Sequence, residues 1–469
     1  MRIQRVSIKE FKNLRDFDCT FSRSNIAAFI GNNGSGKSNL LEAITRAFSN
    51  AQNIVCDKPL PLVYPGEKTD LQDCVIEYSV ENINYTLKYN FGIEETNSDT
   101  DIDALSERRE TVEIWHNDQK LSKNEFSKAL PETVLIYYAG ETQRQKGIAE
   151  TTYDMFYEGK LKRAQTSDLP SLRFIDCYNV DDLTLLLVVA SAYKGEYYQE
   201  ILELLDCEEI LPKFSLILKI PSNGKGNADT YWGATGFVKS FLDDLRKFLS
   251  GTRDLETQYF MFFNEPNFLT NVSQNELDLF AKFKVLKHYG YLDHIGIEFK
   301  KKDGAHFSSL RLSEGEKQLV LLYLLTAFTT QSNCLYIFDE FDAYLHLNWQ
   351  RQMSKMLNDV QVNGHIIFTT HSPATISNMK RQNVFIMENG KVCSARSDTF
   401  NRSLDEIMEE QMLVTMRPKI FTDLEKEFRN AVIHNQKDVA IAKLEQIREI
   451  VGDDDPFFIT ASMALRRME

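Results

Sequence analysis

The sequence lacks the features that mark secreted, membrane-spanning and disulfide-bonded proteins. Its seven cysteines lie far apart with no CxxC pair, which fits packing roles in a reducing cytosol. No stretch approaches the roughly 18 consecutive apolar residues of a membrane span. The first residues, MRIQRVSIKEF, lack the apolar core of a signal peptide. We therefore expect a cytoplasmic protein with no membrane partner.

Positive charge is also in short supply. The chain has 54 lysines and arginines against 68 aspartates and glutamates, a net charge of −14. A protein that coats duplex DNA would be basic, because phosphate contacts supply most non-specific affinity. Any DNA contact is therefore expected through a partner or a local patch. Residues 160–163 (KLKR) are one candidate patch, and the alternative is an ordinary solvated helix face.

Heptad repeats, internal repeats and low-complexity tracts are absent as well, so we expect no coiled-coil arm. The hydrophobic fraction of 43% and the charged fraction of 26% are ordinary for a globular protein. At 469 residues the chain is long enough for two to four domains.

A glycine-rich stretch near the N-terminus predicts a phosphate loop. The apolar run at 26–30 predicts a buried strand, and apolar residues recur at helical spacing from Leu40 to Phe48. Between them stands GNNGSGKS, which fits the pattern GxxxxGK[ST]. Backbone N–H groups of such a loop converge on phosphate, Lys37 should reach the β- and γ-phosphates, and Ser38 should bind Mg²⁺. The predicted ATP-binding residues are Gly31, Asn32, Asn33, Gly34, Ser35, Gly36, Lys37 and Ser38.

Three polar residues end two later apolar strands. Asp339 and Glu340 follow the strand at 335–338, and His371 follows the strand at 366–369. We expect Asp339 to hold Mg²⁺, Glu340 to orient and deprotonate the attacking water, and His371 to contact the γ-phosphate, because phosphoryl transfer needs positioned charge. Alone, an Asp-Glu pair after a strand is usually a helix cap and a lone histidine is usually structural. The phosphate loop upstream favours the catalytic interpretation.

A second anion-binding pattern lies at RLSEGEKQ, residues 311–318. The pattern predicts a polar turn followed by a helix, with Ser313, Gly315 and Glu316 at the helix start. One active site needs one phosphate loop, so this motif has no obvious task within the same site. We therefore expect Ser313 and the backbone of Gly315 to bind the γ-phosphate of a nucleotide that is held by another copy of the chain. ATP would then join two subunits.

Taken together, these motifs resemble the ABC-type ATPase heads of the SMC and RecF class. GNNGSGKS resembles Walker A, LSEGEKQ the ABC signature, LYIFDE Walker B, FDAYLH the D-loop and TTHSP the switch-histidine segment. The resemblance implies that Asp342 leads the D-loop. It also implies a Q-loop glutamine that helps bind Mg²⁺ after the strand ending in Tyr138, and Gln143 and Gln145 are both candidates, with Gln143 preferred.

A narrower resemblance points to the PtuA-type ATPases of Septu anti-phage defence and of some retron systems. It is carried by FKNLRDF near the start, YYAGETQR at 137–144 and GDDDP near the end. The resemblance implies a homo-oligomer, minimally a dimer of heads, that works with an HNH nuclease like PtuB. The sequence departs from relatives in having Phe341 where many have proline, which leaves the carboxylates of the metal site in place.

The implied architecture is α/β, an ABC-type P-loop ATPase head with a mixed sheet, flanking helices and an antiparallel β lobe. We expect the half-head with Walker A at 1–140, a mainly helical insertion at 141–310, the half-head with signature and Walker B at 311–399, and a helical segment at 400–469. Within the insertion the sequence predicts helices such as 185–205 and a strand at 215–220. In the last segment, Ile420, Leu424, Phe428 and Val432 mark one amphipathic helix face. Only 168 residues separate Gln143 from Leu312, which is too few for an SMC arm. About 70 residues follow the head, so we expect no nuclease domain in this chain, and the acidic cluster at 453–455 is interpreted as a helix N-terminus.

Three functions compete at this point. The leading one is an ATP-binding and ATP-hydrolysing regulator of a nuclease in phage defence. A RecF-like repair ATPase that binds DNA without a dedicated nuclease is the second, and the acidic charge argues against it. A scaffold whose nucleotide never turns over is the third, and the full set of catalytic residues argues against that.

Overall fold

The structure is a computed structural model that describes residues 1–55, 71–93, 108–138, 148, 161–169, 174–178, 180–359, 362–400, 402–412, 419–452 and 455–467. The chain forms two compact units, Met1–Phe400 and Asn401–Glu469. None of the helices in these ranges is both long and apolar enough to cross a membrane.

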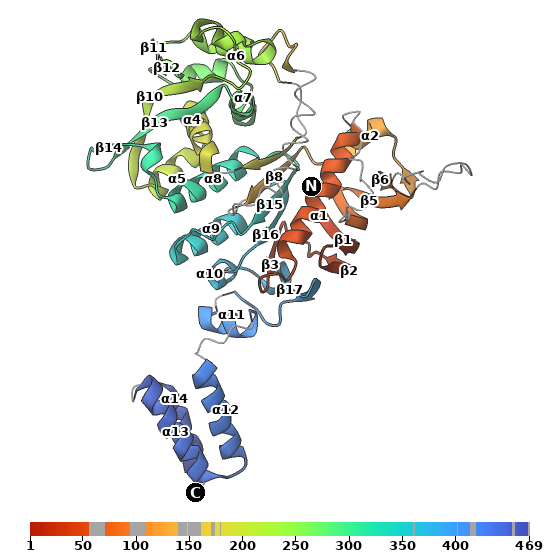
Figure 1. The fold of residues 1–469 in the computed structure, drawn as a ribbon, viewed down its shortest axis with the longest axis vertical. Helices are drawn as coiled ribbons and strands as arrows, with labels where there is room; N and C mark the ends of the chain where they lie inside the picture. Colours follow the sequence, from red (N-terminus) through yellow and green to blue (C-terminus); the bar gives the residue numbers. More distant parts are fainter. Residues whose placement is uncertain are drawn as a thin grey trace. The chain divides into compact units, whose positions relative to one another are not determined.

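A seven-stranded sheet forms the centre of the first unit (Figure 1). Six of its strands are parallel, and only β18 runs antiparallel to its neighbour. The central strands are continuous apolar runs because both faces of the sheet are covered. The strands are, in order across the sheet, β18 (Lys391–Ser394), β17 (Val384–Glu388), β3 (Ile26–Ile30), β16 (Gly364–Thr369), β15 (Cys334–Asp339), β8 (Thr133–Tyr138) and β9 (Phe174–Tyr178).

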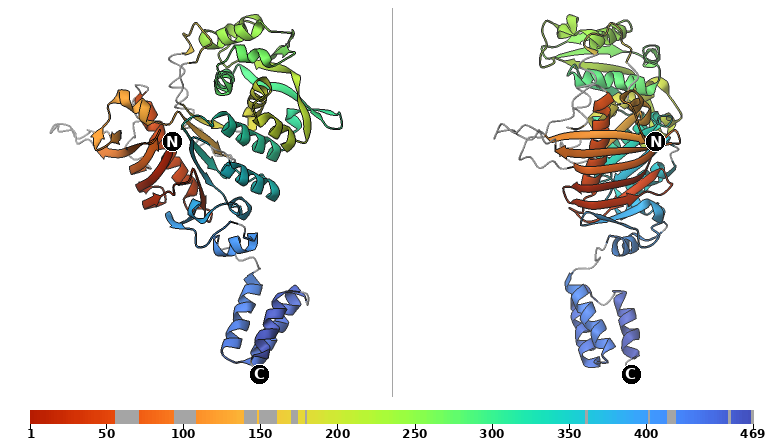
Figure 2. Two further views of the ribbon diagram at one scale, coloured as in Figure 1. Left: turned by 180° about the vertical axis from the view of Figure 1, so that it is seen from behind. Right: turned by 90° about the vertical axis from the view of Figure 1, so that its right-hand side faces the viewer.

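A six-stranded antiparallel sheet forms the predicted β lobe. In β1 the buried residues Ile3, Val6, Ile8 and Phe11 point to the core, largely in the alternation expected of a half-buried strand. Figures 1 and 2 show α1 between the two sheets, where it contacts strands of both. The strands of the β lobe are, in order across this antiparallel sheet, β2 (Leu14–Thr20), β1 (Arg2–Phe11), β4 (Leu71–Val80), β5 (Ile83–Ile93), β6 (Arg108–His116) and β7 (Gln119–Lys120).

Helices flank the central sheet on both sides. On the face opposite α1 lie α8, α9 and α10 (Figure 1). The fold class expected from the sequence, an α/β ATPase head with a β lobe, is confirmed. The helices of the head are α1 (Lys37–Val55), α2 (Lys123–Ala129), α8 (Glu314–Phe328), α9 (Leu347–Asp359) and α10 (Pro373–Ile376).

The insertion is more mixed than expected. It adds a five-stranded antiparallel sheet to the predicted helices, whereas the sequence indicated one strand, at 215–220. The stretch 185–205 is two helices rather than one, because Lys194 adopts a left-handed conformation (φ 49°). The strands of the insertion sheet are, in order across the sheet, β11 (Gly251–Asp254), β12 (Gln258–Phe263), β10 (Cys207–Lys219), β13 (Leu292–Lys301) and β14 (His306–Ser308). The helices of the insertion are, in chain order, α4 (Leu183–Tyr193), α5 (Tyr197–Leu204), α6 (Gly236–Arg246) and α7 (Glu276–His288).

The insertion rests on the helix that carries the predicted signature. Both α4 and α5 contact α8, and β14 leads through a short 3-10 helix, Ser309–Arg311, into Ser313 at the start of α8. The insertion is therefore joined to the head at the motif expected to meet a second subunit.

The second unit is helical, as expected for 400–469. Phe421, Phe428 and Phe457 form its core, while Ile420, which the sequence placed on the apolar face, is 67% exposed. The side chain of Asp455 accepts a hydrogen bond from the backbone N–H of Phe457, in keeping with a helix start at the acidic cluster. The helices are α11 (Leu404–Glu410), α12 (Lys419–Ile433), α13 (Lys437–Val451) and α14 (Phe457–Arg466).

Candidate active site

The predicted phosphate loop connects the fully buried strand β3 to α1. Gly31 and Gly36 have φ values of 147° and 107°, which residues with a side chain rarely adopt. A Cβ at Gly31 would lie 2.3 Å from the carbonyl oxygen of Met387, and one at Gly36 would lie 2.8 Å from Leu14 Cδ2. These positions need glycine because neighbouring strands and turns press directly on the loop.

Two turns hold this loop from outside. Asn13, in the turn between β1 and β2, donates from Nδ2 to the carbonyl oxygen of Gly34 at 2.8 Å and accepts from Asn39 Nδ2 at 2.7 Å. The N–H of Gly390, in the β17–β18 turn, donates to the carbonyl oxygen of Ser35 at 2.9 Å. The loop is thus shaped by contacts from segments distant in sequence.

Lys37 lies inside the loop and is 5% exposed. Its ammonium donates to the carbonyl oxygens of Gly31 and Asn32 at 2.8 and 3.2 Å. Burial lowers the pKa of Lys37, and Glu340 and Asp339 oppose that shift. A buried cation held by two carbonyl oxygens can exchange them for phosphate oxygens without a large rearrangement.

Asp339 ends β15 beside the loop and is 2% exposed. Its Oδ1 accepts hydrogen bonds from Ser38 Oγ at 3.1 Å and from the hydroxyl of Thr369. Burial raises the pKa of this carboxyl, while the two hydroxyl donors oppose the rise. The structure therefore brings together Ser38 and Asp339, two of the three residues predicted to bind Mg²⁺.

The pair suits a cation that arrives with its nucleotide. In the described part of the chain no group of three or more His, Cys, Asp or Glu side chains could hold a metal by itself. Mg²⁺ typically takes only one or two carboxylates and completes its shell with phosphate oxygens and water. Ser38 and Asp339 fit that donor set and would let the ion neutralise phosphate charge.

Glu340 projects from the same edge in an unusual backbone conformation. Its φ is 49°, and its N–H donates to Thr369 Oγ1 at 2.9 Å. The side chain is 40% exposed, and Oε1 lies 3.8 Å from His371 Nε2. Burial and the charge of Lys37 lower the pKa of His371, and Glu340 opposes this. An imidazole whose surroundings favour its neutral form and a solvent-accessible carboxylate thus lie next to each other.

Asp342 is placed differently from an exposed ligand-binding residue. It is 3% exposed, and its Oδ2 accepts from the hydroxyls of Thr370 and Thr375. Burial raises the pKa of this carboxyl. In this structure Asp342 fastens the segment after β16 to the segment after β15, and its contact with nucleotide stays a prediction.

The signature motif forms a helix cap. Ser313 and Glu316 make a reciprocal capping box at the start of α8, with Ser313 Oγ accepting from the N–H of Glu316 at 3.3 Å. A Cβ at Gly315 would lie 2.8 Å from the ring of Trp349. In the described part of the chain, no hydrogen bond or ion pair joins Ser313 or Glu316 to the phosphate-loop residues. That separation leaves contact across a subunit interface as a prediction.

Some predicted residues lie outside the described ranges. Gln143 and Gln145 are among them, and β8, the strand expected to precede them, ends at Tyr138 paired with Asp339. Of the candidate DNA patch at 160–163, residues 161–163 are described, with Lys162 and Arg163 exposed and Leu161 buried.

Sequence reasoning missed three residues that position this site. Asn13 is hydrogen-bonded to the phosphate loop, and Thr369 is hydrogen-bonded to Asp339. Gln318 donates from Nε2 to the carbonyl oxygen of Phe341. Thr369 could have been suspected from its place at a strand end, as with His371. Asn13 and Gln318 act over contacts that the sequence does not reveal.

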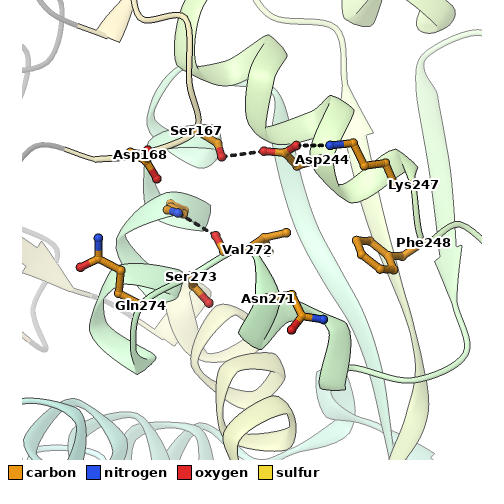
Figure 3. Close-up of a pocket in the computed structure, with 10 residues that line it drawn as sticks. Ser167, Asp168, Asp244, Lys247, Phe248, Asn271, Val272, Ser273 and Gln274 are labelled. Carbon is orange, nitrogen blue, oxygen red and sulfur yellow. Dashed lines mark hydrogen bonds and ion pairs between the residues drawn. The ribbon is translucent and has the colours of Figure 1, made fainter.

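The described pocket in the insertion is separate from this site (Figure 3). It has a volume of about 360 Å³. Its charged groups are largely paired already, because Asp244 accepts from Ser167 and Lys247 at 2.6 and 2.7 Å and Lys282 donates to the carbonyl oxygen of Val272 at 2.7 Å. It contains none of the residues of the phosphate-loop site.

Comparison with known proteins defines the class. Residues 2–394 match the model of the RecF/RecN/SMC N terminal domain. The chain therefore belongs to this family, and it is an ATPase of the SMC and RecF class.

Two curated relatives are retron proteins. The chain is 22% identical to the Retron Vc95 probable ATPase of Vibrio cholerae serotype O1 biovar El Tor, over 93% of this chain and 85% of that protein. It is 28% identical to the Retron Ec83 probable ATPase of Escherichia coli, over 28% of this chain and 27% of that protein.

Solved SMC heads are also similar in structure. The SMC head domain from Thermotoga maritima is 14% identical with a TM-score of 0.35, covering 85% of this chain and 100% of that one. A Pyrococcus furiosus Smc head with an extended coiled coil, bound to the C-terminal domain of ScpA, is 14% identical with a TM-score of 0.37, covering 87% and 98%.

Proposed function

We propose that the chain is the ATP-hydrolysing regulatory subunit of a bacterial anti-phage defence complex, in which two heads pair around ATP and control a partner HNH nuclease. The observation that carries the ATPase part is the convergence of Lys37, Ser38, Asp339, Glu340 and His371 at one edge of the sheet. Relatives named as retron ATPases support the defence setting.

The residues divide the chemistry among them. Lys37 and the loop N–H groups bind the phosphates, and Ser38 and Asp339 hold Mg²⁺. Glu340 accepts a proton from the attacking water while His371, kept neutral by its surroundings, donates a hydrogen bond towards the γ-phosphate. Ser313 and Gly315 of a second copy would close the site from the other side, so that ATP occupancy sets the spacing of the heads.

Pairing would transmit the nucleotide state to the nuclease. The insertion contacts α8 directly, so a movement of the signature helix would move the insertion as well. The insertion is therefore a surface that we expect to dock or restrain the effector, and we propose the C-terminal helices as a second one.

Affinity purification of the chain from its native cells, followed by mass spectrometry, tests the partner. A small HNH protein at fixed stoichiometry supports the proposal. Recovery of replication or recombination proteins with DNA, and no nuclease, would favour a RecF-like repair ATPase instead. Purification after mutation of Lys37 to alanine is the matched control, because a partner recruited through ATP-driven pairing should be lost or reduced.

A further inference from the structure

Gln318 is a buried polar residue on the signature helix, five residues after Ser313. Its side chain is 1% exposed, Nε2 donates to the carbonyl oxygen of Phe341, and Oε1 has no hydrogen-bond partner in the part of the chain that the structure describes. Buried polar groups are nearly always hydrogen-bonded, and leaving one unpaired costs stability. The hydrogen bond from this amide to the carbonyl oxygen of Phe341 is therefore the contact that distinguishes Gln318 from an apolar side chain of similar size.

The Phe341 carbonyl is the first backbone acceptor after the residue expected to be the catalytic base. Glu340 has a φ of 49°, a left-handed conformation that a residue with a side chain keeps only when its surroundings enforce it. Thr369 binds the N–H of Glu340 from one side. Gln318 binds the carbonyl of the next residue from the other side. The strained backbone is therefore held by two side chains, one from β16 and one from α8.

These contacts connect two parts of the head that the sequence treats as separate motifs. The helix α8 begins at Ser313, where a second copy's nucleotide is expected to bind, and one turn later Gln318 reaches the segment of Glu340. We propose that Gln318 is a positioning residue that fixes Glu340 and makes its placement depend on α8. A head whose signature helix binds the partner's ATP would thereby align the Glu340 side chain in its own active site. This inference rests on the proposed function, in which Glu340 is the base.

The helix has a second attachment that does not involve Gln318. Gly315 allows α8 to pack closely on α9, because a Cβ there would meet the Trp349 ring at 2.8 Å and the carbonyl oxygen of Tyr344 at 3.3 Å. Loss of the Gln318 hydrogen bond should therefore leave α8 in place and release only the backbone beside Glu340.

Replacement of Gln318 by methionine removes the donor and nearly conserves volume. In the full-length chain we expect Gln318→Met to lower kcat roughly 10- to 100-fold, since small misplacements of a catalytic group carry costs of that size. The Kd for ATP should not change, because Lys37 and Ser38 are untouched. Thr326→Val is the matched control. Thr326 is equally buried on α8, its hydroxyl donates to the carbonyl oxygens of Leu322 and Tyr323 in the same helix, and turnover should be unaffected.

A double-mutant cycle separates positioning through Glu340 from a general structural effect. Gln318→Met should slow the wild-type chain but add nothing in a Glu340→Gln background. Wild-type turnover in Glu340→Gln alone would refute the role of Glu340 in the proposed function. Two results would overturn the inference about Gln318 and leave the proposed function standing. In the first, Glu340→Gln is slow but Gln318→Met turns over ATP at the wild-type rate. In the second, both variants are slow and their effects add fully in the double mutant.

Gln318→Glu keeps the inference testable if the methionine variant fails to fold. A carboxylate cannot donate to the Phe341 carbonyl, whereas the protonated acid can, and burial raises the pKa of a carboxyl group. Turnover relative to wild type should therefore rise as the pH is lowered from about 8 to about 6. A ratio that stays flat over this range would contradict the assignment.

Discussion

Substitution of Glu340 by glutamine tests the chemistry of the site most sharply. The amide keeps the shape and most of the hydrogen bonds of the carboxylate but cannot take the proton from water. We expect turnover to fall by roughly 10²–10⁴, the usual contribution of a positioned general base. That loss corresponds to about 3 to 5 kcal/mol of activation free energy.

ATP binding should survive the same change. Lys37 is buried within the loop and Ser38 lies 3.1 Å from Asp339, so the groups expected to hold the phosphates and Mg²⁺ do not depend on the Glu340 carboxylate. The assay is phosphate release at saturating ATP, beside ATP binding at equilibrium. The variant should bind ATP at least as tightly as wild type and trap the paired state.

Glu388→Gln is the matched control. Glu388 ends β17, whose carboxyl end lies at the same edge of the parallel sheet, and its contact with Arg396 is an exposed pair. Its replacement should leave turnover within about twofold of wild type. The reasoning about Glu340 would be refuted if both variants hydrolysed ATP at the wild-type rate.

Three further predictions concern binding and stability. Lys37→Ala should abolish ATP binding in a calorimetric titration, and undiminished affinity would remove Walker A from the site. Asn13→Ala should weaken ATP binding about tenfold by releasing the loop, with kcat little changed, since the hydrogen bonds of this exposed side chain are worth about 1 kcal/mol each. Asn117→Ala, in the exposed turn between β6 and β7, is the control. His365 is buried, and burial lowers its pKa to about 3 from 6.5. The folded state thus favours the neutral ring, so stability is complete above about pH 6.5 and declines as the pH falls towards 3; the thermal midpoint of wild type should drop more steeply on acidification than that of His365→Asn, and parallel curves would contradict this.

Local patterns in the sequence were sufficient to predict the head. Strands such as Ile26–Ile30 and Cys334–Asp339 are uninterrupted apolar runs because parallel strands are covered on both faces, and the motif residues stand directly at their carboxyl ends. Two residues that follow neighbouring parallel strands must lie close together. For that reason the proximity of Glu340 and His371 could be anticipated.

Long-range contacts could not be anticipated in the same way. Asn13 contacts Gly34 and Gln318 contacts Phe341 because of how the sheets and helices pack. The sequence around Asn13 and Gln318 carries no signal that would distinguish them from an ordinary turn residue and an ordinary helix residue. The insertion sheet was missed for another reason: β10 pairs with β13 through several register shifts, which break the regular alternation. Ile420 was misplaced because the helix starts at Lys419 and buries Phe421 instead.

The central claim is that one active site is built from two chains, and mixing two inactive variants tests it directly. Lys37→Ala should fail to bind ATP, and Ser313→Arg should bind ATP as a monomer but block pairing across the signature. In a heterodimer, one site has both defects and the other has neither. An equal mixture should therefore recover turnover that neither variant shows alone, because each heterodimer carries one intact site; dimers that assembled at random would give about a quarter of the wild-type rate. A mixture no more active than its two components, or full activity of Ser313→Arg by itself, would contradict the account.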